Sequence, residues 1–134
     1  MIYMLDSNTC AFIMNERHGV IERFRKALPL GVGVSSIVLS ELEYGVRKSS
    51  AQERNRNKLN SLCALISIYP YETAATAEYG IIRSELERQG QVIGSLDMLI
   101  AAHAKSLGLI FVTNNTGEFS RVAGLALEDW VEKD

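Results

Sequence analysis

The chain has 134 residues, 47% of them hydrophobic, which suits one compact domain over residues 1–134 with a substantial buried core. Its 14 basic and 16 acidic residues give a net charge of −2, which excludes a histone-like protein that binds nucleic acid through bulk positive charge. Its two cysteines are far apart and indicate neither a zinc clip nor a disulfide framework, so both are predicted to be core thiols in a reducing compartment.

The sequence carries no sign of export or membrane insertion. The apolar run at residues 1–5 is too short for a signal peptide and lacks a basic lead. No later segment approaches the roughly 20 apolar residues of a membrane span. We therefore expect a cytoplasmic protein without a membrane partner.

Short apolar runs alternate along the chain with segments of helical periodicity. The runs predicted to form buried strands cover residues 1–5, 32–35, 66–69 and 109–113. Apolar residues at helical spacing predict helices at residues 73–89 and 96–107, each followed directly by a glycine. This alternation predicts an α/β domain with a parallel sheet, whose ligand sites lie beyond the carboxyl ends of the strands.

Polar residues follow the first predicted strand at once. Asp6, Ser7 and Asn8 would bring a carboxylate, a hydroxyl and an amide to the edge of the sheet where ligands bind. A structural explanation competes, because an aspartate in this position also caps the helix that follows. Position alone leaves both roles open.

Two glutamates follow the second predicted strand, in the helical segment at residues 35–48. Residues three and four apart share a helix face, so Glu41 lies among apolar residues on an inward face, where a charge needs a partner. Glu43 has Arg47 four residues on, in the favourable orientation for a surface ion pair. Glu41 is therefore the candidate site residue, and Glu43 is predicted to be a solvated helix residue.

Asp97 stands in the first turn of the predicted helix at residues 96–107, with Ser95 as a candidate N-cap. Interaction with the helix dipole is a sufficient reason for an aspartate there. Its context is unusual, because only Asp97 and His103 are polar between positions 96 and 104. At 100° per residue His103 lies about 240° round the helix from Asp97, so we predict a core or interface histidine outside the site.

Glu118 follows the last predicted strand and completes a set of four acids. Asp6, Glu41, Asp97 and Glu118 can all reach one edge of the sheet. Carboxylates held that close repel one another unless a cation neutralises them. Oxygen ligands without Cys or His suit magnesium or manganese, and such an ion can activate water and stabilise charge on a phosphate. The sequence thus indicates a metal-dependent site for phosphodiester hydrolysis.

Five segments of the chain together carry a family resemblance. They are Asp6-Ser7-Asn8, residues 40–45, residues 93–97 leading into 100–104, Thr113-Asn114-Asn115 ending near Phe119, and Glu128-Asp129-Trp130. In this order they resemble the PIN-domain ribonucleases, and they are most similar to the VapC-type toxins of bacterial toxin–antitoxin pairs. The resemblance covers essentially the whole chain.

The resemblance implies a fold and an activity. The fold is a three-layer α/β/α sandwich around a short, mostly parallel sheet. The activity is that of a magnesium- or manganese-dependent endoribonuclease that cleaves cellular RNA of the tRNA or rRNA class. Toxins of this type are silenced by a cognate antitoxin that wraps the toxin and blocks its active site, and they commonly form homodimers and larger toxin–antitoxin assemblies.

The resemblance also implies roles for particular residues. Asp6, Glu41 and Asp97 match the three central carboxylates, which are both catalytic and metal-binding. Asn8 would orient Asp6 through a hydrogen bond. Ser7 stands where the usual motif has threonine and keeps the hydroxyl.

The fourth acid departs from the usual pattern. Asn115 stands where many members carry an acid, whereas Glu118 lies where several members have an additional acid just before the phenylalanine. We therefore expect Glu118 to complete the catalytic and metal-binding set. Asn115 and Thr113 would support it.

Three other features of the sequence suggest alternative functions. A non-catalytic receiver-like signalling module is also a small α/β domain, but it needs an acidic pair after the first strand, a central aspartate and a late lysine, and none of these is present. Gly31-Val32-Gly33 lacks the third glycine of a nucleotide-binding loop and is predicted to be a turn into the second strand. Five of the 14 cations fall within residues 47–58, which indicates a solvated helix face or a surface that contacts phosphates.

Overall fold

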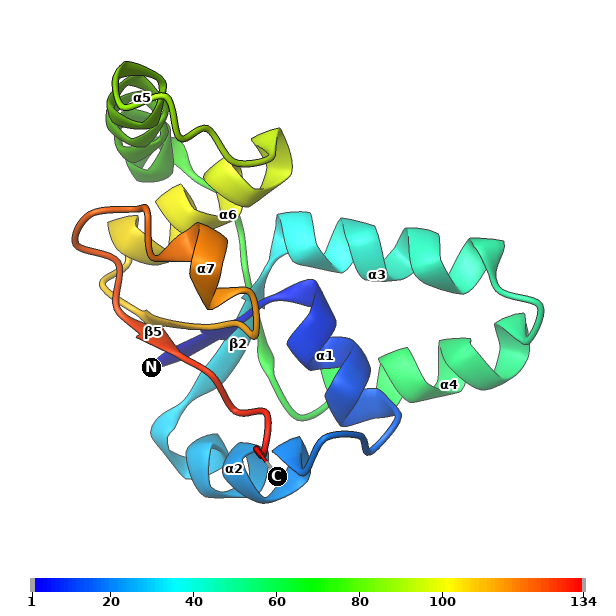
Figure 1. Ribbon diagram of the computed structural model, residues 1–134. Coiled ribbons are helices and arrows are strands. Elements are labelled where there is room, and N and C mark those ends of the chain that lie inside the picture. The colour runs from blue at the N-terminus through cyan, green and yellow to red at the C-terminus, as the bar shows by residue number, and fades with distance from the viewer. Residues whose placement is uncertain (1, 134) are drawn as a thin grey trace.

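The computed structural model describes residues 2–133 and contains one parallel sheet surrounded by helices (Figure 1). The strands are β1 Tyr3–Leu5, β2 Val32–Ser35, β3 Ser67–Tyr69, β4 Ile110–Val112 and β5 Leu127–Glu128. The helices are α1 Ser7–Met14, α2 Val20–Ala27, the 3-10 helix η1 Leu28–Leu30, α3 Ser36–Lys48, α4 Gln52–Cys63, α5 Thr73–Arg88, α6 Ser95–Ser106 and α7 Thr116–Phe119.

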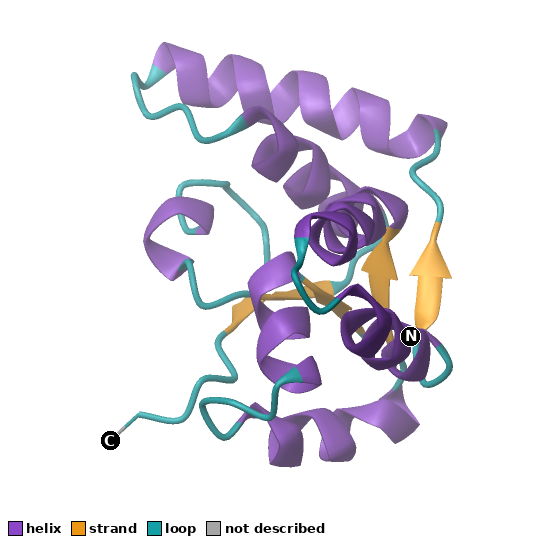
Figure 2. Ribbon diagram, turned by 90° about the vertical axis from the view of Figure 1, so that its right-hand side faces the viewer, coloured by secondary structure: helices purple, strands orange, loops and turns teal. Residues whose placement is uncertain are grey.

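The sheet has the strand order β3-β2-β1-β4-β5, and every neighbouring pair is parallel. Central β1 pairs with β2 on one side and with β4 on the other, so that Leu5 stands opposite both Val34 and Val112. Figure 2 shows the strands in the middle of the molecule with helices on both sides. The predicted α/β sandwich is confirmed, and the sheet is wholly parallel in the described residues.

The predicted strands and helices agree with the structure to within two residues at each end, apart from residue 1, which lies outside the described residues. The fifth strand, β5, was not predicted, because two residues are too few to show a periodicity. Gly31 lies outside the sheet, as predicted for a turn into the second strand, and Gly33 lies inside β2, where a Cβ would come within 2.5 Å of the Tyr69 ring.

The core explains why the central strands read as unbroken apolar runs. Met4 and Leu5 of β1, Val34 of β2, and Phe111 and Val112 of β4 are fully buried, as expected for strands covered on both faces. Helix α6 packs along α5 on one side of the sheet. Helices α3 and α4 form a hairpin that projects from the body of the molecule (Figure 1).

Two further expectations can be compared with the structure. Cys10 is buried, as predicted for a core thiol, but Cys63 is only half-buried because it ends α4 near the surface. Both thiols are free. No helix among residues 2–133 is long and apolar enough to cross a membrane.

Candidate active site

Asp6 combines the two roles that the sequence left open. It is the N-cap of α1, where its carboxylate accepts a 2.8 Å hydrogen bond from the Thr9 backbone N–H, and it is only 7% exposed. Burial raises the pKa of Asp6, and hydrogen bonds from Thr113 and Thr9 partly oppose this. The role of Asn8 in orienting Asp6 stays a prediction, because the hydrogen bonds that Asp6 accepts here come from Thr9 and Thr113.

Glu41 projects from α3 toward the start of α1. Its Oε1 accepts a 2.8 Å hydrogen bond from the Ser7 hydroxyl, so the hydroxyl next to Asp6 holds a different carboxylate. Glu43 is solvated, as predicted, but its ion-pair partner is Arg56 of α4 and not Arg47. The α3–α4 hairpin brings the Arg56 guanidinium to both carboxylate oxygens of Glu43. This two-point contact is stronger than a single ion pair between Glu43 and Arg47 on one helix would be. The pair lowers the pKa of Glu43.

Asp97 lies half-buried in the first turn of α6. The N-cap of this helix is Gly94 and not Ser95, which is the first helical residue. Burial is the largest cause of the raised pKa of Asp97, followed by the negative charges of Glu118, Glu41 and Asp6. Each of the other three predicted acids is therefore close enough to Asp97 to act on its ionisation.

A polar cavity of about 150 Å³ lies among these side chains. Its lining residues are Asp6, Ser7, Asn8, Glu41, Asp97, Ile100, Phe111, Asn115 and Phe119. Glu118 is not among them. Its Oε2 accepts a 3.0 Å hydrogen bond from the Asn115 side-chain amide, and Asn115 reaches the cavity instead. Asn115 and Glu118, which the sequence offered as alternatives for the fourth position of the site, are thus joined by a hydrogen bond.

Asp129 is a further acid near the site, and the sequence indicated no role for it. It follows β5, and its charge contributes to the raised pKa of Asp6. Its carboxylate accepts hydrogen bonds from the Asn114 side chain at 3.1 Å and the Val131 backbone N–H at 3.0 Å. The only sequence feature that pointed to Asp129 was the family resemblance of Glu128-Asp129-Trp130. No local pattern predicts that this segment lies beside Asp6.

The donor set of the cavity suits a hard cation. Its charged lining groups are carboxylates, and neither cysteine nor histidine lines it. Among residues 2–133, no three acidic, histidine or cysteine side chains already stand at coordinating distance from one point. The residues therefore fit magnesium or manganese by chemistry, and the carboxylates would have to turn inward to meet an ion.

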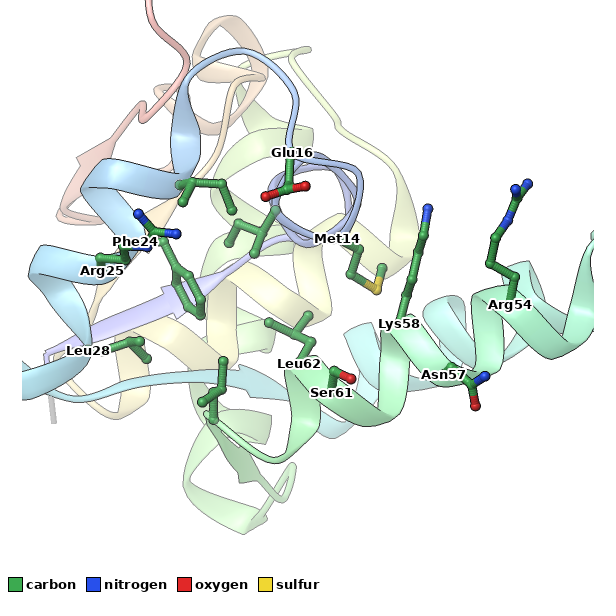
Figure 3. Close-up of a pocket in the computed structure, with 13 residues that line it drawn as sticks. Met14, Glu16, Phe24, Arg25, Leu28, Arg54, Asn57, Lys58, Ser61 and Leu62 are labelled. Atoms are coloured by element: carbon green, nitrogen blue, oxygen red, sulfur yellow. The ribbon is translucent and has the colours of Figure 1, made fainter.

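A larger apolar groove of about 570 Å³ runs between α1, α2 and α4 (Figure 3). Its floor includes Ile13, Met14, Ile21, Phe24, Leu28 and Leu62, and its rim carries Arg25, Arg54 and Lys58. A smaller depression of about 190 Å³ shares Met14 and Lys58 with this groove and Glu41 with the acidic cavity. The two sites are thereby connected along the surface.

Comparison with known proteins identifies the family. The PIN domain family model matches residues 3–125, which is most of the chain. The chain belongs to the PIN domain family. The predicted resemblance is thus confirmed, and the receiver-like alternative is wrong.

Three similar proteins place the chain among the VapC proteins. It is 47% identical over 132 residues to the tRNA(fMet)-specific endonuclease VapC of Shigella flexneri, with 96% of this chain and 97% of that protein covered. VapBC2 from Rickettsia felis, in a crystal structure with a fragment of promoter DNA, matches with a TM-score of 0.92 at 39% identity, covering 97% of this chain and 99% of that one. DNA-bound VapBC from Salmonella typhimurium matches with a TM-score of 0.91 at 42% identity, covering 97% and 98%.

Proposed function

We propose that this protein is a metal-dependent endoribonuclease toxin that cleaves tRNA and is neutralised by a cognate antitoxin. The observation that carries the proposal is full-length similarity, at 47% identity, to a protein named for cleavage of tRNA(fMet). The cavity shared by three carboxylates at the carboxyl edge of the sheet supports it. Transfer RNA is therefore the first substrate to test, and tRNA(fMet) the first species within it.

In this proposal Asp6, Glu41, Asp97 and Glu118 hold magnesium or manganese. A bound ion would supply an activated water molecule and offset the charge that develops on the scissile phosphate. The protein contributes fixed positions. Thr9 holds the Asp6 carboxylate through the first turn of α1. Burial of the carboxylate favours cation binding, because the ion would relieve the desolvation that raises the pKa of Asp6 and that the threonine hydrogen bonds only partly oppose.

Supporting residues aim the carboxylates. The Ser7 hydroxyl donates to Glu41, which leaves the second oxygen of that carboxylate free to face the cavity. Thr113 donates its side-chain hydroxyl toward Asp6 and accepts the Asn115 backbone N–H at 3.0 Å. Asn115 in turn donates to Glu118. We therefore assign Glu118 to the outer wall of the site, where its carboxylate would bind the ion through a water molecule.

The apolar groove is the proposed docking site for the antitoxin. The similar solved structures are VapBC toxin–antitoxin complexes. An amphipathic segment would place its apolar face on the floor and acidic residues against the basic rim. The depression that links the groove to Glu41 gives such a segment a path toward the active site. We also propose a cytoplasmic location, a homodimer and larger toxin–antitoxin assemblies.

The cations of residues 47–58 differ in whether the protein already provides them with a partner. The Arg56 guanidinium is occupied by Glu43, Lys58 donates to Asn15 at 2.8 Å, and Lys48 lies 5.3 Å from the centre of the Tyr44 ring. The exposed Arg54 on the rim of the groove is the cation best placed to contact either RNA phosphates or antitoxin carboxylates.

The deciding experiment incubates the purified, antitoxin-free chain with tRNA(fMet), bulk tRNA and rRNA in magnesium or manganese. We expect cleavage that stops with EDTA, returns when the metal is restored, and is absent in Asp6→Asn. Asparagine still caps a helix, so this variant keeps α1 and loses only the charge. Glu43→Gln is the matched control, because it also removes a carboxylate from the chain but lies outside the cavity.

Two results would overturn the proposal. Cleavage that survives both EDTA and Asp6→Asn would reject the metal–carboxylate mechanism. A folded wild-type chain that cleaves none of these RNAs while binding them tightly would favour a binding role.

A further inference from the structure

His103 and Ser35 form a buried polar contact that the proposed mechanism does not use. The His103 ring lies on α6, the Ser35 side chain ends β2, and their Nδ1 and Oγ atoms are 2.8 Å apart. His103 is 1% exposed and Ser35 is fully buried. The surrounding face of α6 is apolar, with Ala101, Ala102 and other neighbours buried as well. A histidine here costs desolvation that an apolar side chain would not incur, so the contact calls for a specific explanation.

Ser35 already accepts one hydrogen bond and keeps its hydroxyl proton available for the contact with His103. Ser35 is the N-cap of α3, and its Oγ accepts the Ile37 backbone N–H at 3.1 Å. A hydroxyl has one proton, so Ser35 is free to donate that proton to Nδ1 of His103. With that proton donated to Nδ1, the ring carries its own proton on Nε2, which is buried and lacks a partner of good geometry among the described residues. Burial lowers the pKa of His103 and so favours the neutral ring, and a hydrogen bond to the Pro70 backbone partly opposes this.

Tyr71 contacts both partners of this region, the His103 ring and the start of α3. The Tyr71 ring packs edge-on against the His103 ring with centroids 5.4 Å apart. The Tyr71 backbone N–H donates to the Ser36 hydroxyl at 3.2 Å. The first residues of α3 are therefore bound both to α6 and to the segment that follows β3.

Each end of this hydrogen bond leads along a helix to a carboxylate of the site. Glu41 follows Ser35 by six residues, and Asp97 precedes His103 by six residues. At 1.5 Å per residue, each acid lies about 9 Å along a helix from the contact. A helix transmits a shift at one end to its other residues almost rigidly. A slip of α3 against α6 at this contact would therefore move one acid relative to the other.

We propose that His103 is a positioning residue, which fixes the start of α3 against α6 through Ser35 and so sets the separation of Glu41 and Asp97. The inference rests on the proposed function for its catalytic consequence. It assigns the hydrogen bond to the geometry of the site and not only to the stability of the core.

The test measures Mn²⁺ affinity by calorimetry, together with kcat and KM for tRNA cleavage. We expect His103→Leu, which keeps the bulk and removes the acceptor, to lower Mn²⁺ affinity and kcat by about tenfold, as loss of an outer partner of a metal ligand does. KM for the RNA should stay within about twofold. His103→Asn presents an amide oxygen near the position of Nδ1 and should restore both quantities to within about threefold.

A matched control separates positioning from stability. Leu86→Ala removes a buried side chain of α5, the helix that packs along α6, and should lower Tm without changing Mn²⁺ affinity. If His103→Leu lowers Tm as Leu86→Ala does and leaves Mn²⁺ affinity unchanged, the proposal is wrong. If His103→Leu does not fold, His103→Gln takes its place, because glutamine moves the acceptor from the Nδ1 to the Nε2 position.

Two further arms make the result specific. In a Ser35→Ala background, His103→Leu should cost no further Mn²⁺ affinity, and an undiminished loss there would overturn the route through Ser35. If the wild-type chain neither binds Mn²⁺ nor cleaves RNA, the proposed function fails, and crystal structures of wild type and His103→Leu then decide the positioning claim. A shift of α3 against α6 supports it, and superposable helices overturn it.

Discussion

The acidic cavity and the apolar groove share one connected surface but are built in different ways. The cavity is small, about 150 Å³, and its polar groups come from the ends of β1 and β4, the first turns of α1 and α6, and one face of α3, which supplies Glu41. The groove is larger, about 570 Å³, and is lined by the sides of α1, α2 and α4. The cavity is built mainly around strand ends, whereas the groove depends on helix faces alone.

This difference decides how each site can change. A parallel sheet fixes where its strands end, so residues that follow them are held within narrow limits, as catalysis requires. A groove between helices depends on apolar area and shape, which many side chains can supply. We therefore expect substitutions in the cavity to reduce chemistry far more than partner binding, and substitutions in the groove to reduce partner binding far more than chemistry.

The largest expected effect is on catalysis. Asp97→Asn should lower the rate of tRNA cleavage by more than about 100-fold, because even outer partners of a metal ligand are typically worth about 10- to 100-fold. Antitoxin affinity should change far less, because the groove supplies most of the apolar contact area. The measurement is single-turnover cleavage at saturating magnesium beside an antitoxin titration, and a loss of less than tenfold would remove Asp97 from the metal-binding set.

The second effect concerns the groove. Leu65 lines it and is 59% exposed, so Leu65→Glu should fold normally and weaken the antitoxin by at least about tenfold, through loss of apolar contact and burial of a charge. Leu107→Glu, at a position 48% exposed outside the groove, is the control. Competition binding with purified antitoxin measures both. Equal affinities for the two variants would place the antitoxin elsewhere.

A third and smaller effect tests the outer wall of the cavity. Glu118→Gln should weaken Mn²⁺ binding and activity by about tenfold, whereas Asn115→Ala should cost only about two- to threefold, because the amide carries no charge. Calorimetry and cleavage rates measure the pair. The reverse order would assign the fourth position to Asn115, which already lines the cavity.

The smallest effect is on the stability of the metal-free chain. Burial and neighbouring acids raise the pKa of Asp97, so its ionised form is less stable in the folded state than in the unfolded one. Asp97→Asn should therefore raise Tm by a few degrees near neutral pH, and the gain should vanish as pH falls through the raised pKa toward 3.8. Glu43→Gln should do the opposite, because Arg56 lowers the pKa of Glu43. Thermal melts of both variants and the wild-type chain across pH, without metal, measure these changes in Tm. A change of the same sign in both variants would contradict the prediction.

Local patterns were sufficient for much of the fold and the site. The strands β1, β2 and β4 are unbroken apolar runs, and the residues that follow them had to lie at one edge of the sheet. Asp6, Glu41 and Asp97 were predicted from that rule together with helical spacing, and all three line one cavity. The amphipathic stripe of α3 separated Glu41 from Glu43 correctly for the same local reason.

Several of the failed or missing predictions concern partners distant in sequence. Local spacing gave Glu43 the partner Arg47, whereas the hairpin brought Arg56. Asn8 is the sequence neighbour expected to orient Asp6, and the sequence did not indicate that Thr113, from beyond β4, also donates to that carboxylate. Asp129 reaches the site only because β5 adds to the edge of the sheet.

The sequence by itself determined the alternation of strands and helices and the candidate acids Asp6, Glu41 and Asp97 that line one cavity, because each depends on periodicity or position within one element. The tertiary structure alone decided which hydroxyl donates to which carboxylate and that Asn115, not Glu118, lines the cavity. It also decided where the apolar groove runs and that Ser35 contacts His103. These depend on the packing of elements far apart in the chain, and no short-range pattern records the distances that packing sets.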